Sequence, residues 1–458
     1  MTHHVTIIGG GLAGSEAALN LANRGFAVRL WEMRPVQPTA VHHSDQFAEL
    51  VCSNSLKSMK PDSAAGLLKE ELTVLESPVL AAAKRHAVAA GGALAVDREQ
   101  FAADITERIL AHPRIEVVRG EAVDLAALAQ ETDALVLASG PLTSDGLSSA
   151  LMDLTGRDAL AFYDAAAPVV MADSIDMDKV FRQSRYEDAE AGGDYLNAPF
   201  SREEYDAFIE ELLGAERVIK KDFESKDLFQ ACQPIEEIAR AGHDAPRFGT
   251  LKPVGLTDPR TGRRPWAALQ LRAEDAFGTS YNLVGFQTNL TFPEQRRVFS
   301  MIPGLEHAEF ARYGVMHRNT FIDAPRLLDN HNRLVTPQAQ TLGVPVYVVG
   351  QLAGTEGYCE AIRSGLHGAL AVAADLRGVP LPELSVDTVY GALLHYATEE
   401  TTVDYQPMHV NFGIMRPFEP RIRNKKERYR AYADRANAAL TSYRAALDKA
   451  GLMTPSEM

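Results

Sequence analysis

The chain has 458 residues, of which 46% are hydrophobic, so it can bury the cores of about two or three domains. Its formal net charge of −15 argues against unselective binding of nucleic acid, because phosphate binding needs a surplus of Lys and Arg. No apolar run approaches the ~20 residues of a membrane span, and the first apolar run is too short for a signal peptide, so we expect a cytoplasmic protein.

The first predicted strand leads into a glycine-rich turn. Residues 5–8 are a β-branched apolar run, and the pattern G-x-G-x-x-G then leads into a helix-forming segment that stops at Gly25. The pattern comprises Gly9, Gly10, Gly11, Leu12, Ala13 and Gly14. In such a unit Gly9 permits the turn, Gly11 lets the backbone approach a pyrophosphate at the helix N-terminus, and Gly14 allows helix and strand to pack closely.

A second strand over residues 27–31 completes this unit and ends in Glu32. An acid about twenty residues after the glycines hydrogen-bonds ribose hydroxyls in dinucleotide-binding folds. Its charge would repel the extra phosphate of NADP, so FAD or NAD fits better. The start of the chain therefore predicts a Rossmann-type dinucleotide site.

Later elements extend the fold beyond this first unit. Asp97 is expected to cap a helix, with Gln100 at the capping-box position and Pro113 beyond its end, and residues 115–118 are expected to form a strand. Residues 133–140 predict a buried strand that closes on a glycine turn. In flavoproteins with two dinucleotide domains, a strand of this kind returns to the first sheet after a β excursion.

The pattern changes from about residue 160 to residue 312, where acidic turns and aromatic residues replace the βαβ repeat. Ser201 and Glu204 are expected to cap a helix that runs to Leu213. Residues 258–264 have the composition of a hairpin loop. The sequence thus predicts an inserted α+β domain.

The dinucleotide pattern returns in the last third of the chain. We expect a strand over residues 344–349 and a helix over residues 358–377 that ends at Gly378. Between them lies a second glycine-rich turn with Gly350, Gln351, Gly354 and Gly357. The N-terminus of that helix could stabilise negative charge at the flavin N1/O2 edge on reduction, a device that NAD-only dehydrogenases do not need. This second turn favours FAD.

These elements predict an α/β fold of the kind found in flavoproteins with two dinucleotide domains. We expect a Rossmann-type FAD-binding domain in two parts, residues 1–159 and 316–458, with an inserted α+β domain at residues 160–315. The second part also carries the C-terminal helices. In the last of these helices, apolar and tyrosine residues share one face before Gly451, and such a face is more often core than a base-stacking surface. The face comprises Tyr429, Tyr432, Ala436, Leu440, Tyr443 and Leu447.

Two stretches are locally basic despite the acidic total. Residues 247–272 contain six basic residues against one acid, and residues 416–430 contain seven against two. Composition alone leaves two interpretations open, a solvated face or a contact for phosphate.

Residues that could bind metal or form disulfides are sparse. His42 and His43 are adjacent, without a third ligand at a helical spacing, so we predict no metal site. Cys52, Cys232 and Cys359 are too widely spaced for a disulfide framework or a C-x-x-C pair. Taken alone, each cysteine is most simply a buried structural thiol, and we keep that interpretation for Cys359, which lies early in a predicted helix.

Four longer motifs resemble one family. They are Glu-Leu-Val-Cys-Ser-Asn-Ser-Leu-Lys-Ser at 49–58, Ala-Cys-Gln-Pro-Ile-Glu-Glu at 231–237, Tyr-Asn-Leu-Val-Gly-Phe-Gln-Thr-Asn-Leu at 281–290 and Met-His-Arg-Asn-Thr at 316–320. Over nearly its whole length the chain resembles the folate- and FAD-dependent tRNA (uracil-5-)-methyltransferases, the TrmFO family. The larger MnmG (GidA) tRNA-modifying flavoproteins share the glycine-rich ends, but this chain lacks their additional C-terminal length.

The resemblance implies formation of 5-methyluridine at the T-loop uridine of tRNA. The one-carbon unit would come from 5,10-methylenetetrahydrofolate, and the reducing equivalents from NADH or NADPH through FAD. Cys232 matches the nucleophile of the family and Cys52 its second cysteine. Uracil C5 becomes nucleophilic only after a group such as a thiolate adds to C6, and a hydride is needed to reduce the transferred methylene to methyl.

The resemblance also changes the interpretation of other residues. It favours both basic stretches as contacts to tRNA. Gln351 departs from the aspartate that many flavoproteins of this fold place on the ribityl chain.

Three functions are alternatives to tRNA methylation. They are an NAD(P)H-dependent flavin oxidoreductase, an MnmG-like enzyme that modifies wobble uridines, and a non-catalytic RNA-binding flavoprotein.

Overall fold

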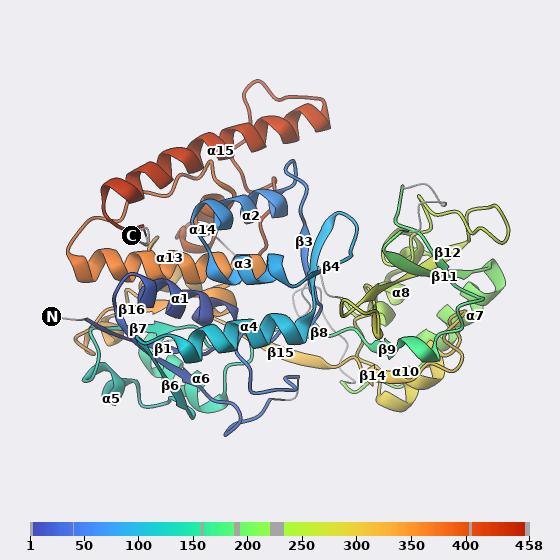
Figure 1. Ribbon diagram of the computed structural model, residues 1–458, viewed down its shortest axis with the longest axis horizontal. Helices are drawn as coiled ribbons and strands as arrows, with labels where there is room; N and C mark the ends of the chain where they lie inside the picture. The colour runs from blue at the N-terminus through green and yellow to red at the C-terminus, as the bar shows by residue number, and fades with distance from the viewer. Residues whose placement is uncertain are drawn as a thin grey trace.

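The structure is a computed structural model that describes residues 3–39, 41–156, 160–186, 193–219, 233–402 and 405–453. These residues form two lobes that lie side by side and are joined by a two-stranded ribbon (Figure 1). The ribbon consists of β8 (Leu160–Ala165) and β15 (Met316–Phe321), which pair antiparallel. One lobe therefore interrupts the sequence of the other.

The first lobe is built on a five-stranded parallel sheet. Its strand order is β16-β7-β1-β2-β6, and every neighbouring pair is parallel. The bounds are β1 His4–Ile8, β2 Ala27–Glu32, β6 Ile115–Arg119, β7 Ala134–Leu137 and β16 Val346–Val348. Each of these strands overlaps one that the sequence predicts, and the predicted Rossmann-type α/β class is confirmed.

Helices cover both faces of this sheet, which is why its strands are apolar on both sides. In β7, Ala134 and Val136 belong to a core with α1 (Leu12–Asn23) and α13 (Tyr358–Arg377). The alternate residues Leu135 and Leu137 belong to a second core. That core contains α5 (Leu125–Ala129), α6 (Asp145–Thr155), α11 (Ala324–Leu327) and α12 (Pro337–Gln340). As predicted, α13 ends at Gly378, which has a φ of 65°.

A β excursion separates β2 from the return of the chain to the sheet, as the sequence predicts. It is a three-stranded antiparallel sheet in the order β3-β5-β4 with three helices. The bounds are β3 Ser55–Ser58, α2 Ala64–Val74, α3 Pro78–Arg85, β4 Ala87–Val88, β5 Ala93–Val96 and α4 Arg98–Ala111. Asp97 caps α4 by accepting the Gln100 N–H at 3.1 Å, but the Gln100 side chain donates to the Asp97 carboxylate at 2.7 Å. In a full capping box the side chain at the Gln100 position accepts the backbone N–H of the cap residue. The bond to the Asp97 carboxylate therefore departs from that motif.

The second lobe contains a six-stranded sheet in the order β10-β11-β12-β13-β9-β14, and its neighbouring strands are antiparallel. The strands are β9 Val169–Met171, β10 Phe181–Arg182, β11 Tyr195–Phe200, β12 Ala267–Ala273, β13 Ser280–Leu283 and β14 Phe310–Arg312. The helices are α7 Arg202–Gly214, α8 Ile235–Ala241, α9 Ala245–Phe248 and α10 Phe292–Phe299, besides the short 3-10 helix η1 Ala172–Ser174. The predicted capping box of α7 is present, since Ser201 Oγ accepts the Glu204 N–H at 3.2 Å and Glu204 accepts the Ser201 N–H at 2.7 Å. This α+β lobe agrees with the predicted class.

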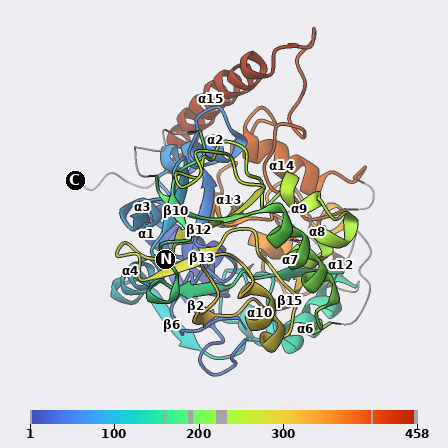
Figure 2. The ribbon, with the colours of Figure 1, turned by 90° about the vertical axis from the view of Figure 1, so that its right-hand side faces the viewer.

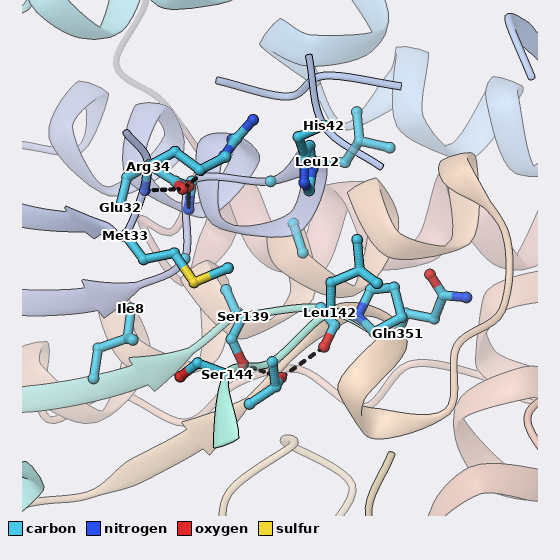
Figure 3. A pocket seen from close by; sticks show the side chains of 18 of the residues that line it. Ile8, Leu12, Glu32, Met33, Arg34, His42, Ser139, Leu142, Ser144 and Gln351 are labelled. Carbon is cyan, nitrogen blue, oxygen red and sulfur yellow. Dashed lines mark hydrogen bonds and ion pairs between the residues drawn. The ribbon is translucent and has the colours of Figure 1, made fainter. Parts of the chain in front are cut away.

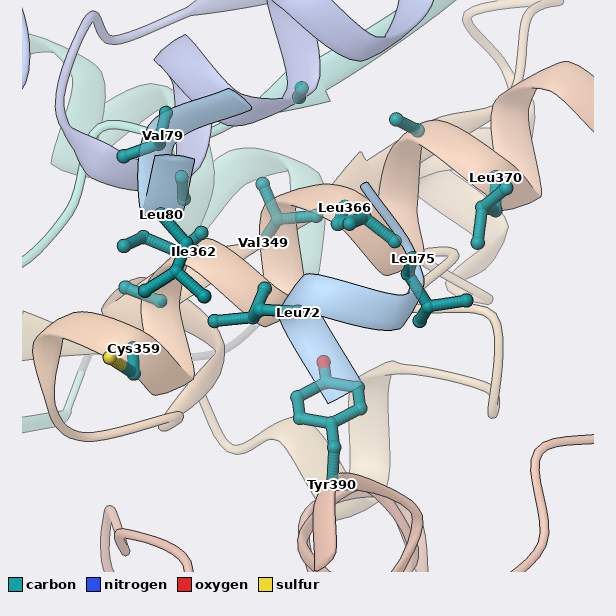
Figure 4. Packing of buried hydrophobic residues seen from close by; sticks show 14 of the residues in the cluster. Leu72, Leu75, Val79, Leu80, Val349, Cys359, Ile362, Leu366, Leu370 and Tyr390 are labelled. Atoms are coloured by element: carbon teal, nitrogen blue, oxygen red, sulfur yellow. The ribbon is translucent and has the colours of Figure 1, made fainter. Parts of the chain in front are cut away.

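The C-terminal helices complete the first lobe. These are α14 (Val389–Thr398) and α15 (Lys425–Lys449), and α15 runs along the top of the molecule when it is seen from the side of the second lobe (Figure 2). Tyr432, Leu440 and Tyr443 are buried, which confirms that the tyrosine face of α15 is core. Cys359 is 3% exposed among apolar residues of α2, α3 and α13, as predicted for a structural thiol (Figure 4). Among the described residues, no helix combines the length and the apolar composition that a membrane span requires.

Candidate functional site

The two glycine-rich turns line one cavity that opens to solvent (Figure 3). Residues 9–13 come from the turn between β1 and α1, and Gln351 and Gly357 come from the turn before α13. Residues 138–144, which follow β7, close a third side. Gly350 and Gly354 shape the second turn with φ values of 75° and 78°, as the first residue and the C-cap of the 3-10 helix η4 (Gly350–Ala353), but they do not line the cavity. Three segments that are far apart in the sequence thus meet at one cavity.

The glycines of the first turn are required for different steric reasons. Gly9 has a φ of 106°, and a Cβ there would lie 2.5 Å from the Ala138 carbonyl oxygen. A Cβ on Gly14 would lie 1.8 Å from the Gly9 carbonyl oxygen, so helix and strand can approach only because the side chain is absent. A Cβ on Gly11 would meet no protein atom within 4 Å, so Gly11 faces open space where a ligand can reach the backbone.

Glu32 lies at the cavity wall with its carboxylate bound to the protein. Oε2 accepts the Gly10 N–H at 3.0 Å, and Oε1 accepts the Arg34 Nε–H at 2.8 Å and the Arg34 N–H at 3.0 Å. Burial opposes ionisation of Glu32, but the Arg34 guanidinium and these N–H groups outweigh it and hold its pKa below the ordinary value. Glu32 therefore carries a charge and braces the glycine turn.

Arg34 is a part of the site that sequence reasoning missed. Besides Glu32 it bonds Glu49 Oε2 at 3.2 Å, and it is 4% exposed. Glu49 in turn accepts the N–H groups of His43 and Ser44 at 2.8 and 3.1 Å, so one buried arginine organises the loop over the cavity. The sequence does contain one signal for this role of Arg34, since a basic residue stands two positions after Glu32, the acid that ends β2.

His42 lines the same cavity and is neutral at ordinary pH. Burial, followed by the charge of Arg34, lowers the pKa of His42 to about 4. Its Nδ1 atom lies 2.7 Å from Thr39 Oγ1. In the described part of the chain no group of three or more His, Cys, Asp or Glu side chains could hold a metal ion.

The second turn provides a carboxylate that the sequence did not single out. The Gln351 amide donates a hydrogen bond to the carboxylate of Glu356, which is 5% exposed. Gln351 replaces the acid expected at the ribityl chain, and an acid five residues further on is bonded to it. Gln351 lines the cavity, whereas Glu356 does not line it and is bonded to the Gln351 amide.

The loop that carries Cys52, residues 50–54, reaches this cavity through its own Val51 and is bonded to a tyrosine of the cavity wall. The hydroxyl oxygen of Tyr358 accepts the N–H groups of Cys52 and Ser53 at 3.0 and 3.2 Å. Tyr358 is the first residue of α13 and lines the cavity. Burial, and then the charge of Cys52, raise the pKa of Tyr358, so the hydroxyl stays protonated. The structure thus brings Cys52 to the edge of the predicted dinucleotide site.

The same loop is bonded to the second lobe by four polar residues, which we call the lobe clamp: Asn54, Arg98, Arg272 and Glu274. Arg272 donates to Asn54 Oδ1 at 2.7 Å and to Ser53 Oγ at 2.9 Å, and Asn54 Nδ2 donates to the Ala273 carbonyl at 3.0 Å. In the opposite direction, Arg98 of the first lobe donates to the Leu50 carbonyl at 2.9 Å and to Glu274 Oε1 at 3.2 Å. Buried charges from both lobes therefore fix the position of the Cys52 loop.

The predicted nucleophile Cys232 lies outside the described residues, which resume at residue 233. The part of its motif that follows is described. Glu236, at the start of α8, is 0% exposed and accepts the Asn289 N–H at 2.6 Å and the Thr288 hydroxyl at 3.1 Å. Burial raises the pKa of Glu236 to about 7. Two of the motifs noted in the sequence, at 231–237 and 281–290, are thus in direct contact.

The basic stretch at 247–272 is only partly a surface. Arg272 is 5% exposed and belongs to the lobe clamp, so its inclusion among phosphate contacts is wrong. Arg247 lies 3.6 Å over the Trp266 ring, and Arg260 pairs with Asp258 at 2.8 Å. Arg263 and Arg264 are exposed on the predicted hairpin turn.

The basic stretch at 416–430 is more accessible. Arg416 pairs with Asp387 at 2.8 Å. The exposed cations of this stretch at and before the start of α15 are Arg421, Arg423, Lys425, Lys426 and Arg430. They form a positive surface at the N-terminal end of α15.

The chain is similar to known proteins in sequence and in fold, and these similarities point to related families. A profile of the family described as Glucose inhibited division protein A matches residues 4–380. The chain is 49% identical over 436 residues to methylenetetrahydrofolate–tRNA-(uracil-5-)-methyltransferase TrmFO of Bacillus licheniformis, covering 95% of this chain and 98% of that protein. It is 52% identical over 445 residues to the protein of the same name from Geobacter sulfurreducens, covering 96% and 98%. Its fold is similar to that of Aquifex aeolicus GidA, with a TM-score of 0.69 at 15% identity over 99% of this chain and 74% of that chain.

Proposed function

This chain belongs to the family of glucose inhibited division protein A and, within it, to the TrmFO proteins, and we infer that it is a methylenetetrahydrofolate–tRNA-(uracil-5-)-methyltransferase. The methyl group would be built on uracil C5 from the one-carbon unit of 5,10-methylenetetrahydrofolate. We further propose the T-loop uridine of tRNA as the target and the cytoplasm as the place of reaction. The structural observation that carries the proposal is that a cysteine-bearing loop meets the cavity between the two glycine turns, through Tyr358.

The residues present fit FAD as the cofactor of that cavity. Gly11 leaves the backbone open to a pyrophosphate, Glu32 is charged and faces the cavity, and Gln351 and Gly357 reach it from the second turn. We propose that these residues, with Gly9, Gly10, Leu12 and Ala13, hold FAD. Gly14, Gly350 and Gly354 would act by shaping the two turns. When bound, FAD would supply a hydride, taken from NADH or NADPH, for reduction of the one-carbon unit to methyl.

A thiol is required to activate the uracil. Addition of a thiolate to C6 moves electron density to C5, which then forms a bond to the methylene carbon. Loss of the C5 proton expels the amine that carried the methylene and leaves an exocyclic methylene on the uracil. Addition of a hydride to that methylene gives the methyl group and expels the thiolate from C6. We propose Cys232 as that nucleophile. Cys52 would be the second thiol, held at the cavity edge because Tyr358 and the lobe clamp fix its loop.

The tRNA must bring its uridine to this cavity, so the base has to leave its stack in the folded T-loop. The exposed cations of the 258–264 hairpin and of the start of α15 are suited to the tRNA backbone. Their positive charge is local, since the whole chain carries a formal net charge of −15.

The proposal is tested by transfer of labelled carbon from 5,10-methylenetetrahydrofolate to unmodified tRNA, with NADH or NADPH as reductant. We expect the purified protein to have the absorption spectrum of a bound flavin and to transfer the label. Cys232→Ala should abolish transfer, whereas Cys359→Ala, at a core cysteine, should retain it. Each protein is checked for flavin content and thermal unfolding.

The failures of this experiment are informative. Transfer that persists in Cys232→Ala would remove Cys232 as the nucleophile. Bound flavin with NAD(P)H oxidation but no transfer to tRNA would favour an oxidoreductase, and transfer to a wobble uridine would favour MnmG-like chemistry. Binding of tRNA without any turnover would leave a non-catalytic role.

A further inference from the structure

The second lobe presents an exposed aromatic ring on a hairpin that is bonded to the Cys52 loop. The hairpin joins β12 to β13, and the side chain of Phe277 in its turn is 86% exposed. We propose that Phe277 is a stacking platform for a nucleobase of tRNA that flanks the target uridine. This inference rests on the proposed methylation of tRNA and names a contact that would position the substrate.

One carboxylate fixes the conformation of the hairpin turn. Asp275 Oδ1 accepts the Phe277 N–H at 2.8 Å and the Thr279 N–H at 3.2 Å, and Oδ2 accepts the Thr279 hydroxyl. Gly278 has a φ of 67°, in the left-handed region that favours glycine. The ring of Phe277 is therefore carried by a backbone with little freedom, which lowers the entropy lost when a base binds.

The hairpin is attached to the Cys52 loop immediately before this turn. Asn54 donates to the carbonyl oxygen of Ala273, the last residue of β12, and the next residue, Glu274, is ion-paired with Arg98. Phe277 is four positions after Ala273, so the backbones of these two residues are at most roughly 14 Å apart even in a fully extended chain. That distance is about four stacked base steps of ~3.4 Å. A nucleotide near one that reacts beside Cys52 is therefore within reach of Phe277.

The chemistry of the surroundings suits a base. A uridine that leaves its stack deprives the neighbouring bases of a partner, and aromatic side chains replace such partners in proteins that bind single strands. The two acids of the hairpin are compensated, Glu274 by the Arg98 guanidinium and Asp275 by the turn N–H groups, so neither presents an unpaired charge to phosphate. Stacking is tolerant of base identity, so the contact would position the strand rather than read its sequence.

Another exposed aromatic residue of the same lobe provides a matched control. Phe248, at the end of α9, is 78% exposed, and its ring lies 5.9 Å from the Arg247 guanidinium. It is not part of the β12–β13 hairpin. Removal of its ring changes the exposed apolar surface by a similar amount without touching the proposed platform.

The test compares Phe277→Ala, Phe277→Trp and Phe248→Ala in the flavin-loaded enzyme with unmodified tRNA. We expect Phe277→Ala to lower kcat/KM for tRNA by about 5- to 150-fold, the usual worth of one stacked base, mainly through KM. Phe277→Trp should restore most of the loss because its ring also stacks, and Phe248→Ala should match the wild type. Flavin content and thermal unfolding should be unchanged in all three variants.

A set of tRNAs with one abasic position near the target uridine identifies the stacked base. At that position the abasic tRNA should bind the wild type as weakly as intact tRNA binds Phe277→Ala, and the two changes together should add little. Wild-type kcat/KM in Phe277→Ala, equal losses in Phe248→Ala, or additive losses at every abasic position would overturn the inference. Absence of methylation by the wild-type enzyme would instead contradict the proposed function.

Discussion

At the first glycine turn the close contacts join backbone atoms of a single lobe, whereas around the Cys52 loop they join buried polar side chains of two lobes. Gly14 meets the Gly9 carbonyl within one βαβ unit, while Arg272 reaches Asn54 from another lobe. The first kind of contact depends on the absence of a side chain. The second kind depends on the identity of four side chains. The cofactor site is thus rigid by steric necessity, and the cysteine loop is held in place by polar pairing across the lobes.

The largest effect should come from adding one methyl group to the rigid half. Gly14→Ala forces a Cβ to within 1.8 Å of the Gly9 carbonyl oxygen, so we expect a loss of more than about 3 kcal/mol in the free energy of unfolding. Urea unfolding measures this loss. The matched control is Gly11→Ala, whose Cβ points into open space at a φ of −72°. That variant should unfold like the wild type but bind flavin more weakly, and equal destabilisation of both would contradict the steric account.

The lobe clamp should respond in a different way, because its cost depends on which partners remain. Arg98→Met leaves Glu274, which is 9% exposed, without its cation, and we expect about 3–5 kcal/mol of destabilisation. The double variant Arg98→Met/Glu274→Met removes both charges and should regain much of that loss. Denaturant unfolding of the two variants and of Glu274→Met gives the coupling energy. Additive effects would show that the pair does not act as a unit.

A buried acid in the second lobe should make stability depend on pH. The pKa of Glu236 is raised to about 7 from an ordinary value of 4.5, so the folded state binds more protons in that window. Its contribution is fully present below about pH 4.5 and is lost as the pH rises through about 7. Glu236→Gln should flatten this dependence and gain up to about 3 kcal/mol relative to the wild type at pH 8. Thermal unfolding between pH 5 and 8 measures the slope, and an unchanged slope would contradict the assignment.

The smallest effect is expected on the exposed surface. Arg263→Glu combined with Arg264→Glu should weaken tRNA binding by about 1–2 kcal/mol and reduce its salt dependence, without changing stability. Binding isotherms at several salt concentrations measure both quantities. Arg114→Glu reverses an exposed charge beside the amino-terminal end of β6 and serves as the control. Binding that is unaltered by the hairpin variant would remove this hairpin from the tRNA contact surface.

Many elements of both lobes can be predicted from local patterns. The helix at 358–377 and the capping box of Ser201 and Glu204 depend on residues a few positions apart, and both were predicted correctly. Two glycine turns separated by more than three hundred residues were expected to serve one cofactor, and they line one cavity. Gln100 is less predictable, because its side-chain amide can either accept the backbone N–H of Asp97 or donate to the Asp97 carboxylate.

The amino-acid sequence by itself determined the α/β class, the glycine turns and the family, since each depends on short spacings or on long matching motifs. Only the tertiary structure decided that Arg272 is buried in a clamp, that Arg34 braces Glu32, and that Tyr358 joins the Cys52 loop to the cavity. The reason is physical: an arginine or tyrosine has the same composition signal on a surface and in a core. Its partner, up to some three hundred residues away in sequence, is chosen by packing within and between the two lobes.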